Sequence, residues 1–430
     1  MPNKSKWTVL TYIAAHNNLA QLGKRSLTEI LNVGSTPEVV HGVLYDGVLP
    51  DLHAGAAARY VMGEPGLVKQ QEQLGSFDSG DPDELIATAK WLFERCPAER
   101  YGLVLWSHGS GWEPAESEEI AKAARPGARA DPIESKERAS APGSRALFRT
   151  TLRAILKPDK PAERAILFDD GTGHSLDTIE LARVTGAIAE SVGQPLELLG
   201  MDACLMANIE VAYEVRKAVR YLVASEELVP GHSWPYKQVF SALGANPDQG
   251  GADFARLVVD RYTEFYAANP PGAGDVTKVA LNLGQIHKLV RATDRLAEAL
   301  RVDMSKVGDV LWQVQRGAEQ HETQGGKRQP SKFDYHLWDI GSLATGLAGS
   351  NSNSDRVKQA AANTVKVLSP GVGCVLAEGH RGAWFDRING VSVYLMPPKR
   401  QRISPSYSKL AFAKDTQWDE MLSAYHEYFG

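Results

Sequence analysis

Cysteine is scarce in this sequence. Its 430 residues include only three cysteines, Cys96, Cys204 and Cys374, at wide and irregular spacing. No Cys-x-x-Cys pair is present, which leaves a zinc ribbon or a redox dithiol without support. A small, odd number of cysteines is typical of reduced thiols in a reducing compartment. At least one cysteine is therefore available for a role of its own.

The sequence also lacks a long apolar run and a basic block. No stretch approaches the ~20 apolar residues that cross a bilayer, so no membrane span is predicted. The net charge of −5 is distributed along the chain, which argues against a nucleic-acid partner. The first residues, MPNKSKW, have no apolar core or cleavage site of a secretory signal. We therefore expect a cytoplasmic protein, unless an export signal has been removed.

What is present is an alternation of short apolar runs with amphipathic segments. Residues 101–106 (YGLVLW) are almost wholly apolar, as expected of a central strand that is buried on both faces. Strands separated by helices of about 10–15 residues indicate βαβ units around a mostly parallel sheet. The predicted strands are 7–14, 101–106, 164–168, 196–201 and 221–224, with weaker candidates at 39–45 and 57–62, and the predicted helices begin near 81, 176 and 207.

Two segments depart from this alternation. Residues 113–163 are rich in Ala, Pro, Ser, Arg and Glu, and we interpret them as a flexible linker. From about residue 246 onward the helical patterns become longer, and one late strand is predicted near 390–395. We therefore predict an α/β domain over 1–245 and a mainly helical region over 246–430. The late strand either returns to the main sheet or forms a small sheet.

Reactive side chains directly follow two of the predicted buried strands. His108 lies in WSHGSGW at 106–112, and Cys204 lies in GMDACLM at 200–206. Ligands bind at the carboxyl edge of a parallel sheet, so both side chains are expected there. An imidazole or a helix N-terminus favours thiolate, and the backbone N–H of Gly109 is suited to holding an oxyanion. The alternative is a buried structural cysteine and a turn histidine.

Evidence for a metal site is weaker. Asp169 and Asp170 follow a predicted strand and are candidates for binding Ca²⁺, although carboxylates at strand ends often form turns. His16, His174 and His232 lack the spacing of a zinc hydrolase. The sequence has no P-loop motif and no complete dinucleotide motif.

Taken together, HGSGW at 108–112 and DACLM at 202–206 resemble the clostripain family of cysteine peptidases, within the clan of caspase-like peptidases. Further matches are WTVLTY at 7–12, VASE at 223–226 and GVSVY at 390–394. The resemblance covers most of the chain. It implies a caspase-like fold, in which a mostly parallel sheet is flanked by helices on both faces.

The resemblance also implies roles for particular residues. Cys204 would attack the scissile carbonyl, and His108 would protonate the leaving amine. Similar enzymes cut after Arg or Lys, and the acid that matches the base of their S1 pocket is Asp202, although this residue could instead cap the next helix. Glu226 and Trp234 are weaker candidates for lining the same cleft.

Similar peptidases mature by cutting themselves between the His and Cys segments, so 113–163 is a candidate region for self-cleavage. No cofactor is expected to be required, with bound Ca²⁺ as an option. The expected partner is a protein or peptide with Arg or Lys at the cleavage site, and a pore-forming or defence protein is one hypothesis. Rival functions are a non-catalytic caspase-like module that binds basic segments, and an acyltransferase or ligase. The candidate cleavage sites are Lys136, Arg138, Arg145 and Arg149.

Overall fold

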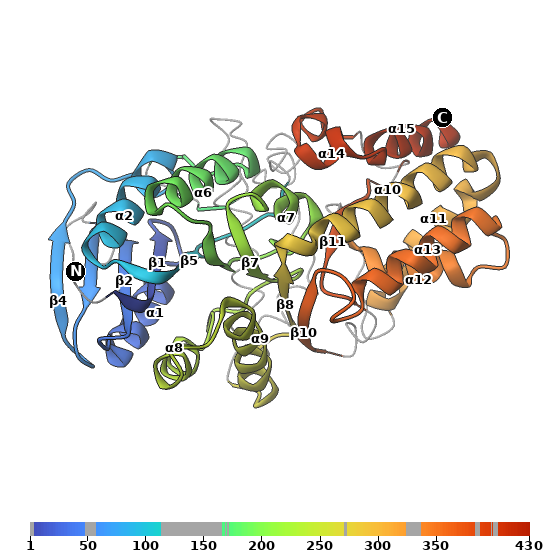
Figure 1. Cartoon of the computed structure of the whole chain (residues 1–430). Helices are drawn as coiled ribbons and strands as arrows, with labels where there is room; N and C mark the ends of the chain where they lie inside the picture. The colour runs from blue at the N-terminus through green and yellow to red at the C-terminus, as the bar shows by residue number, and fades with distance from the viewer. Residues whose placement is uncertain are drawn as a thin grey trace, which may run out of the picture.

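A computed structural model of the chain describes residues 4–47, 57–112, 166, 167, 169, 172–270, 273–323, 337–382, 388–396, 398 and 403–430. A nine-stranded sheet runs through the molecule, with the strand order β10-β8-β7-β6-β5-β1-β2-β3-β4 (Figure 1). Its strands are β1 (Ser5–Ala15), β2 (Val39–Gly47), β3 (Ala58–Met62), β4 (Val68–Gln73), β5 (Ala98–Trp106), β6 (Leu196–Asp202), β7 (Val219–Ala224), β8 (Val276–Asn282) and β10 (Val375–Arg381).

The five central strands, β2, β1, β5, β6 and β7, are parallel, and the two strands at each edge are antiparallel. The register aligns the carboxyl ends of the central strands: Ile13 lies opposite Trp106, and Trp106 lies opposite Asp202. Segments that follow β1, β5 and β6 therefore meet at one edge of the sheet.

Helices cover both faces of this sheet (Figure 1). Alternate residues of β1 enter opposite cores, with Leu10 and Tyr12 on one face and Val9 and Ile13 on the other. The prediction of a mostly parallel sheet between two helical layers is confirmed. One face carries α2 (Pro82–Arg95), α6 (Thr178–Val192) and α7 (Ile209–Val215), and the other carries α1 (Ala20–Val33), α8 (Tyr236–Ala245) and α9 (Gly251–Ala267).

Local sequence signals explain where several of these helices begin. Asp81 caps α2 by accepting a hydrogen bond from the backbone N–H of Asp83, with a proline at the first helical position. Asp177 and Glu180 form a reciprocal capping box at the start of α6. α6 ends at Gly193, whose φ of 71° suits glycine.

The chain after residue 245 contributes to the sheet and to a group of helices beside it (Figure 1). β8 and β10 extend the main sheet, whereas the late strand pairs with β9 in a separate two-stranded sheet. The backbone N–H of Ser392 donates to the carbonyl of Ala207, which ties this small sheet to the segment after β6. The boundary at 245 remains a prediction. The further elements are η1 (Leu283–Gln285), α10 (Ile286–Val302), α11 (Met304–Thr323), β9 (Leu337–Asp339), α12 (Ile340–Gly349), α13 (Asp355–Leu368), β11 (Ser392–Tyr394), η3 (Tyr407–Lys409), α14 (Ala411–Asp415) and α15 (Trp418–Phe429).

Within the described ranges, no helix has both the length and the apolar character that crossing a membrane requires.

Candidate active site

Cys204 and His108 lie at the same edge of the sheet, two residues beyond the paired ends of β6 and β5. Both line one narrow pocket together with Asp202. The pocket encloses about 10 Å³, which is room for about one water molecule. The other lining residues are Leu19, Leu22, Trp106, Ser107, Val229, Pro230, Gly231 and Ser233.

The Cys204 thiol is buried at the turn that follows β6. Only 7% of the surface of Cys204 is exposed, and Sγ accepts a hydrogen bond of 3.3 Å from the backbone N–H of Val229. Leu205, the next residue, has a φ of 63°, a strained conformation for a branched side chain. This sharp turn separates the thiol from α7, which begins at Ile209 rather than near 207 as the sequence suggested.

The His108 imidazole is held by a side chain from the segment after β1. Nε2 lies 2.8 Å from the carboxamide oxygen of Asn18. An amide oxygen only accepts, so Nε2 carries the proton and Nδ1 is the basic nitrogen of the neutral ring. Asn18 was not assigned a role from the sequence. Two signals were present: Asn18 belongs to the Asn18-Leu19 pair that matches the clostripain family, and it lies three residues after β1, at the same sheet edge as His108.

Burial sets the protonation of both groups. Burial raises the pKa of the Cys204 thiol to about 11 and lowers the pKa of His108 to about 3. At neutral pH the two groups are therefore a neutral thiol and a neutral imidazole. The expectation that α7 or His108 would favour thiolate is therefore not met for this buried thiol.

Gly109 brings the backbone after β5 against the nucleophile. A Cβ atom at this position would lie 2.4 Å from the carbonyl oxygen of Cys204 and 3.1 Å from its backbone nitrogen. Only glycine allows this approach. Gly109 therefore lies against the backbone of Cys204, and its oxyanion role stays a prediction.

Asp202 is a buried carboxylate at the end of β6, 2% exposed. Its Oδ2 accepts hydrogen bonds from the backbone N–H of Trp234 at 3.0 Å and from the Tyr236 hydroxyl at 2.8 Å. Its Oδ1 accepts none from the part of the chain that the structure describes. Asn208 caps α7, so the alternative role of Asp202 as that cap is wrong.

A buried lysine that sequence reasoning missed lies near Asp202. Lys278, from β8, is 1% exposed, and its ammonium lies 4.1 Å from the ring centre of Tyr262 and 5.3 Å from that of Trp234. Nζ makes no hydrogen bond with the described residues. Burial lowers the pKa of Lys278 to about 8, while the charge of Asp202 opposes this shift. The only sequence signal was a lysine among Val, Ala and Leu in a short strand, VTKVALN.

The two weaker pocket candidates, Glu226 and Trp234, are not among the lining residues of the pocket. Glu226 is buried, and its pKa is raised well above the usual value by burial and then by Asp339 of β9. Trp234 is fully buried; its backbone supports Asp202, and its ring packs against Gly200 and Tyr236.

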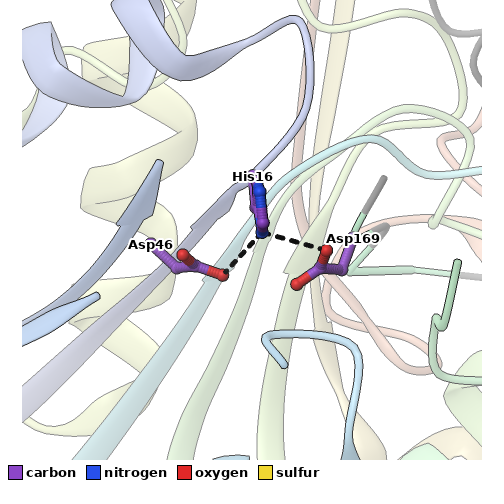
Figure 2. Close-up of side chains that lie close together, drawn as sticks. All are labelled: His16, Asp46 and Asp169. Carbon is purple, nitrogen blue, oxygen red and sulfur yellow. Dashed lines mark ion pairs between the residues drawn. The ribbon is translucent and has the colours of Figure 1, made fainter. Parts of the chain in front are cut away.

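Of the remaining predicted residues, only Asp169 lies among the described residues. The four candidate cleavage sites, Lys136, Arg138, Arg145 and Arg149, lie outside the described residues, as does Asp170. Asp169 is described and buried, next to His16 and Asp46 (Figure 2).

Comparison with known proteins decides the family. The model of the clostripain family, Peptidase_C11, matches residues 11–125 and 153–425. The chain belongs to the clostripain family. Both the family resemblance of the two motifs and the cysteine-peptidase class that it implied are confirmed.

Solved structures agree with this clostripain-family assignment at the level of fold. A secreted C11 cysteine protease from Bacteroides thetaiotaomicron, in complex with an irreversible peptide inhibitor, is 17% identical with a TM-score of 0.62, over 97% of this chain and 99% of that one. An inactive zymogen C11 protease from Parabacteroides distasonis is 14% identical with a TM-score of 0.61, also over 97% and 99%. No curated protein matches the chain.

Proposed function

We propose that this clostripain-family peptidase is an endopeptidase that hydrolyses protein bonds after Arg or Lys, with Cys204 as nucleophile and His108 as proton-transfer partner. The observation that carries the proposal is that Cys204, His108 and Asp202 line one pocket at the carboxyl edge of the sheet.

The chemistry follows from the neutral state of both groups. As sulfur attacks the scissile carbonyl carbon, the thiol proton passes to the basic nitrogen of His108. The resulting oxyanion accepts a hydrogen bond from Gly109 N–H. The C–N bond then breaks, His108 returns the proton to the leaving amine, and water hydrolyses the thioester. Asn18 is the positioning residue that keeps the His108 proton on Nε2.

Asp202 is the proposed acid for the substrate cation. Its Oδ1 has no hydrogen-bond donor among the described residues, and a guanidinium or ammonium group would supply one. Lys278 has the same positive charge as such a substrate side chain, and it lies within electrostatic range of both Asp202 and Cys204. We expect Lys278 to weaken binding of the substrate cation, so Lys278→Met should lower KM for Arg peptides.

Fluorogenic peptides that end in Arg or Lys before the reporter test the activity. We expect turnover by the wild type and loss of turnover in Cys204→Ala and His108→Ala. Cys374→Ala is the matched control, because Cys374 is a second buried cysteine in the core and does not line the pocket. Equal rates in the wild type and Cys204→Ala would reject the peptidase proposal.

Specificity is tested separately with peptides that differ only at the residue before the scissile bond. The proposal predicts that Asp202→Asn lowers kcat/KM for Arg and Lys peptides much more than for a neutral peptide. An equal loss for all peptides would mean that Asp202 supports the pocket without selecting the charge.

We also propose self-cleavage within 113–163, which is motivated by the composition of that segment and its basic residues. Intact-mass analysis should find two chains in the wild type and one in Cys204→Ala. One uncut chain in fully active protein would reject self-cleavage without affecting the peptidase proposal. Proteomic comparison of cells with the wild type and Cys204→Ala would identify the substrate, including any pore-forming or defence protein.

A further inference from the structure

Three side chains from separate parts of the chain converge outside the catalytic pocket. His16 directly follows β1, Asp46 lies in β2, and Asp169 precedes α6. His16 Nδ1 is 3.1 Å from Asp169 Oδ1 and 3.9 Å from Asp46 Oδ2, and the three ligand atoms lie within 4.8 Å of one another. In Figure 2 the imidazole points toward both carboxylates.

We propose that His16, Asp46 and Asp169 bind a divalent transition-metal ion of the Zn²⁺ or Co²⁺ type. Ligand atoms at about 2.0–2.2 Å from such an ion lie roughly 3–4 Å apart, so small adjustments of these side chains suffice. One imidazole and two carboxylates are a common ligand combination for these metals and leave coordination positions for water.

The buried Asp46 carboxylate has an oxygen without a hydrogen-bond donor in the part of the chain that the structure describes, and this is the observation that points to a cation. It is 2% exposed, and its Oδ2, the oxygen nearest to His16, accepts no hydrogen bond from the described residues. The second carboxylate, Asp169, lies beside it, so two acidic side chains meet at this point. A carboxylate oxygen that is buried without a hydrogen-bond donor is costly, and a bound cation would remove that cost.

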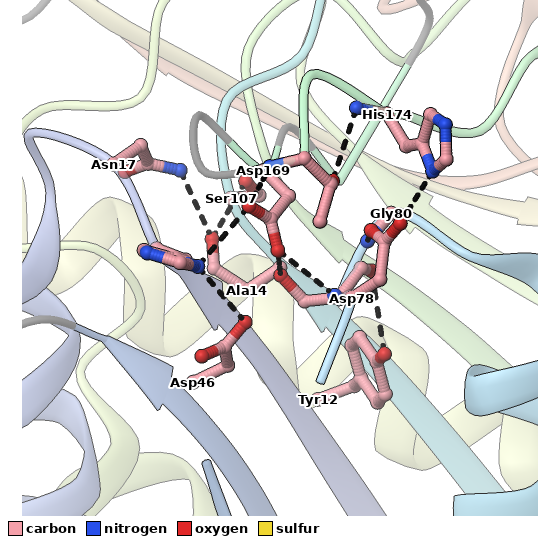
Figure 3. Close-up of polar contacts among 12 residues, drawn as sticks. Tyr12, Ala14, Asn17, Asp46, Asp78, Gly80, Ser107, Asp169 and His174 are labelled. Atoms are coloured by element: carbon pink, nitrogen blue, oxygen red, sulfur yellow. Dashed lines mark hydrogen bonds and ion pairs between the residues drawn. The ribbon is translucent and has the colours of Figure 1, made fainter. Parts of the chain in front are cut away.

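Asp169 is already oriented for such a role. Its Oδ2 accepts from the backbone N–H of Ser79 at 3.1 Å and from the Ser79 hydroxyl at 3.3 Å, and Oδ1 accepts from the backbone N–H of Thr172 at 3.1 Å. Figure 3 shows this network between the ends of the strands. Hydrogen bonds of this kind fix the ligands of protein metal sites.

The imidazole distinguishes this site from a calcium site. Ca²⁺ takes about six to eight oxygen ligands, whereas His16 offers nitrogen. The sequence paired Asp169 with Asp170 as a Ca²⁺ candidate; Asp170 lies outside the described residues, and among the described ones Asp169 is grouped with His16 and Asp46. The ion would act on structure, because none of its three ligands lines the catalytic pocket. His16 lies two residues before Asn18, so the ion would fix the turn that holds His108.

Metal binding is measured on the full chain carrying Cys204→Ala, so that the thiol cannot bind Zn²⁺. After chelator treatment, equilibrium dialysis with ZnCl₂ should give one bound equivalent of Zn²⁺ per chain. Addition of CoCl₂ should give the visible absorption bands of Co²⁺ with a low coordination number. Adding Asp46→Asn should weaken Zn²⁺ binding at least tenfold. His174→Ala is the matched control, because His174 pairs with Asp78 in the same network and should leave binding unchanged.

Thermal unfolding separates loss of ligand from loss of fold. Asp46→Asn removes a buried charge, so the metal-free protein should unfold at the same or a higher temperature, while the stabilisation by Zn²⁺ disappears. His16→Gln provides a second variant if Asp46→Asn does not fold. The proposal is overturned if Zn²⁺ does not bind, if both variants bind it like the parent, or if CaCl₂ stabilises the protein as strongly as ZnCl₂ does.

Discussion

The charges of Asp202 and Lys278 should be coupled in the folded protein. The perturbations are Asp202→Asn, Lys278→Met and the double variant, all in a Cys204→Ala background that prevents self-digestion. Because burial lowers the pKa of Lys278 from 10.5 to about 8, keeping this ammonium charged at pH 7 costs folding about 3 kcal/mol. The nearby Asp202 carboxylate keeps that cost from being larger.

Each single variant removes one charge and leaves the other buried. Asp202→Asn should destabilise the protein by about 1–2 kcal/mol, because an unpaired Lys278 whose pKa falls from about 8 to below neutral pH loses its proton and escapes any further cost. Lys278→Met removes the cost of the ammonium but leaves Asp202 without a cation, so its effect on the free energy of unfolding should be smaller. The double variant should be more stable than the sum of the single effects predicts, by about 1–3 kcal/mol.

Urea unfolding at pH 7 measures this coupling, and a pH series checks its origin. Between pH 8 and 10.5 the unfolded chain holds the Lys278 proton more strongly than the folded chain, so the contribution of Lys278 to stability rises with pH. Lys278→Met should lack this rise. Single effects that add to within about 0.5 kcal/mol, together with the same pH dependence in Lys278→Met, would refute the reasoning.

Three other predictions concern the catalytic pocket. Gly109→Ala should destabilise the protein by about 1–3 kcal/mol and abolish turnover, because its Cβ would overlap the Cys204 carbonyl oxygen. In the control Gly186→Ala, in α6, the new Cβ meets no atom and should stabilise the helix. Unfolding and peptide assays that rank the two variants the other way would contradict the geometry. Asn18→Ala should reduce kcat about fivefold with little change in KM, from loss of one hydrogen bond of about 1 kcal/mol, and an unchanged kcat would remove Asn18 from the mechanism. The alkylation rate of Cys204 by iodoacetamide, followed by mass spectrometry, should increase about tenfold per pH unit toward the thiol pKa of about 11, and a plateau near pH 7 would show a thiolate in the resting protein.

The local sequence determined the architecture and the position of the candidate nucleophile. Apolar runs of strand length, separated by helical patterns with their caps, indicated the parallel centre of the sheet. Parallel strands place their carboxyl ends at one edge, so motifs that follow β5 and β6 had to meet. For this reason Cys204 and His108 could be chosen as partners although they are far apart in the chain.

Only the tertiary structure determined which charged side chains surround Cys204 and His108. Lys278 comes within electrostatic range of Asp202 only because β8 joins the sheet beside β7, and this pairing leaves no periodic signal in the sequence. Glu226 follows β7 as expected, but packing buries it beside Asp339. His16, Asp46 and Asp169 come together through the register of β1 and β2 and the fold of a distant loop. Local spacing fixes which strand end carries a side chain, whereas its burial and its charged neighbours depend on contacts between segments distant in the chain.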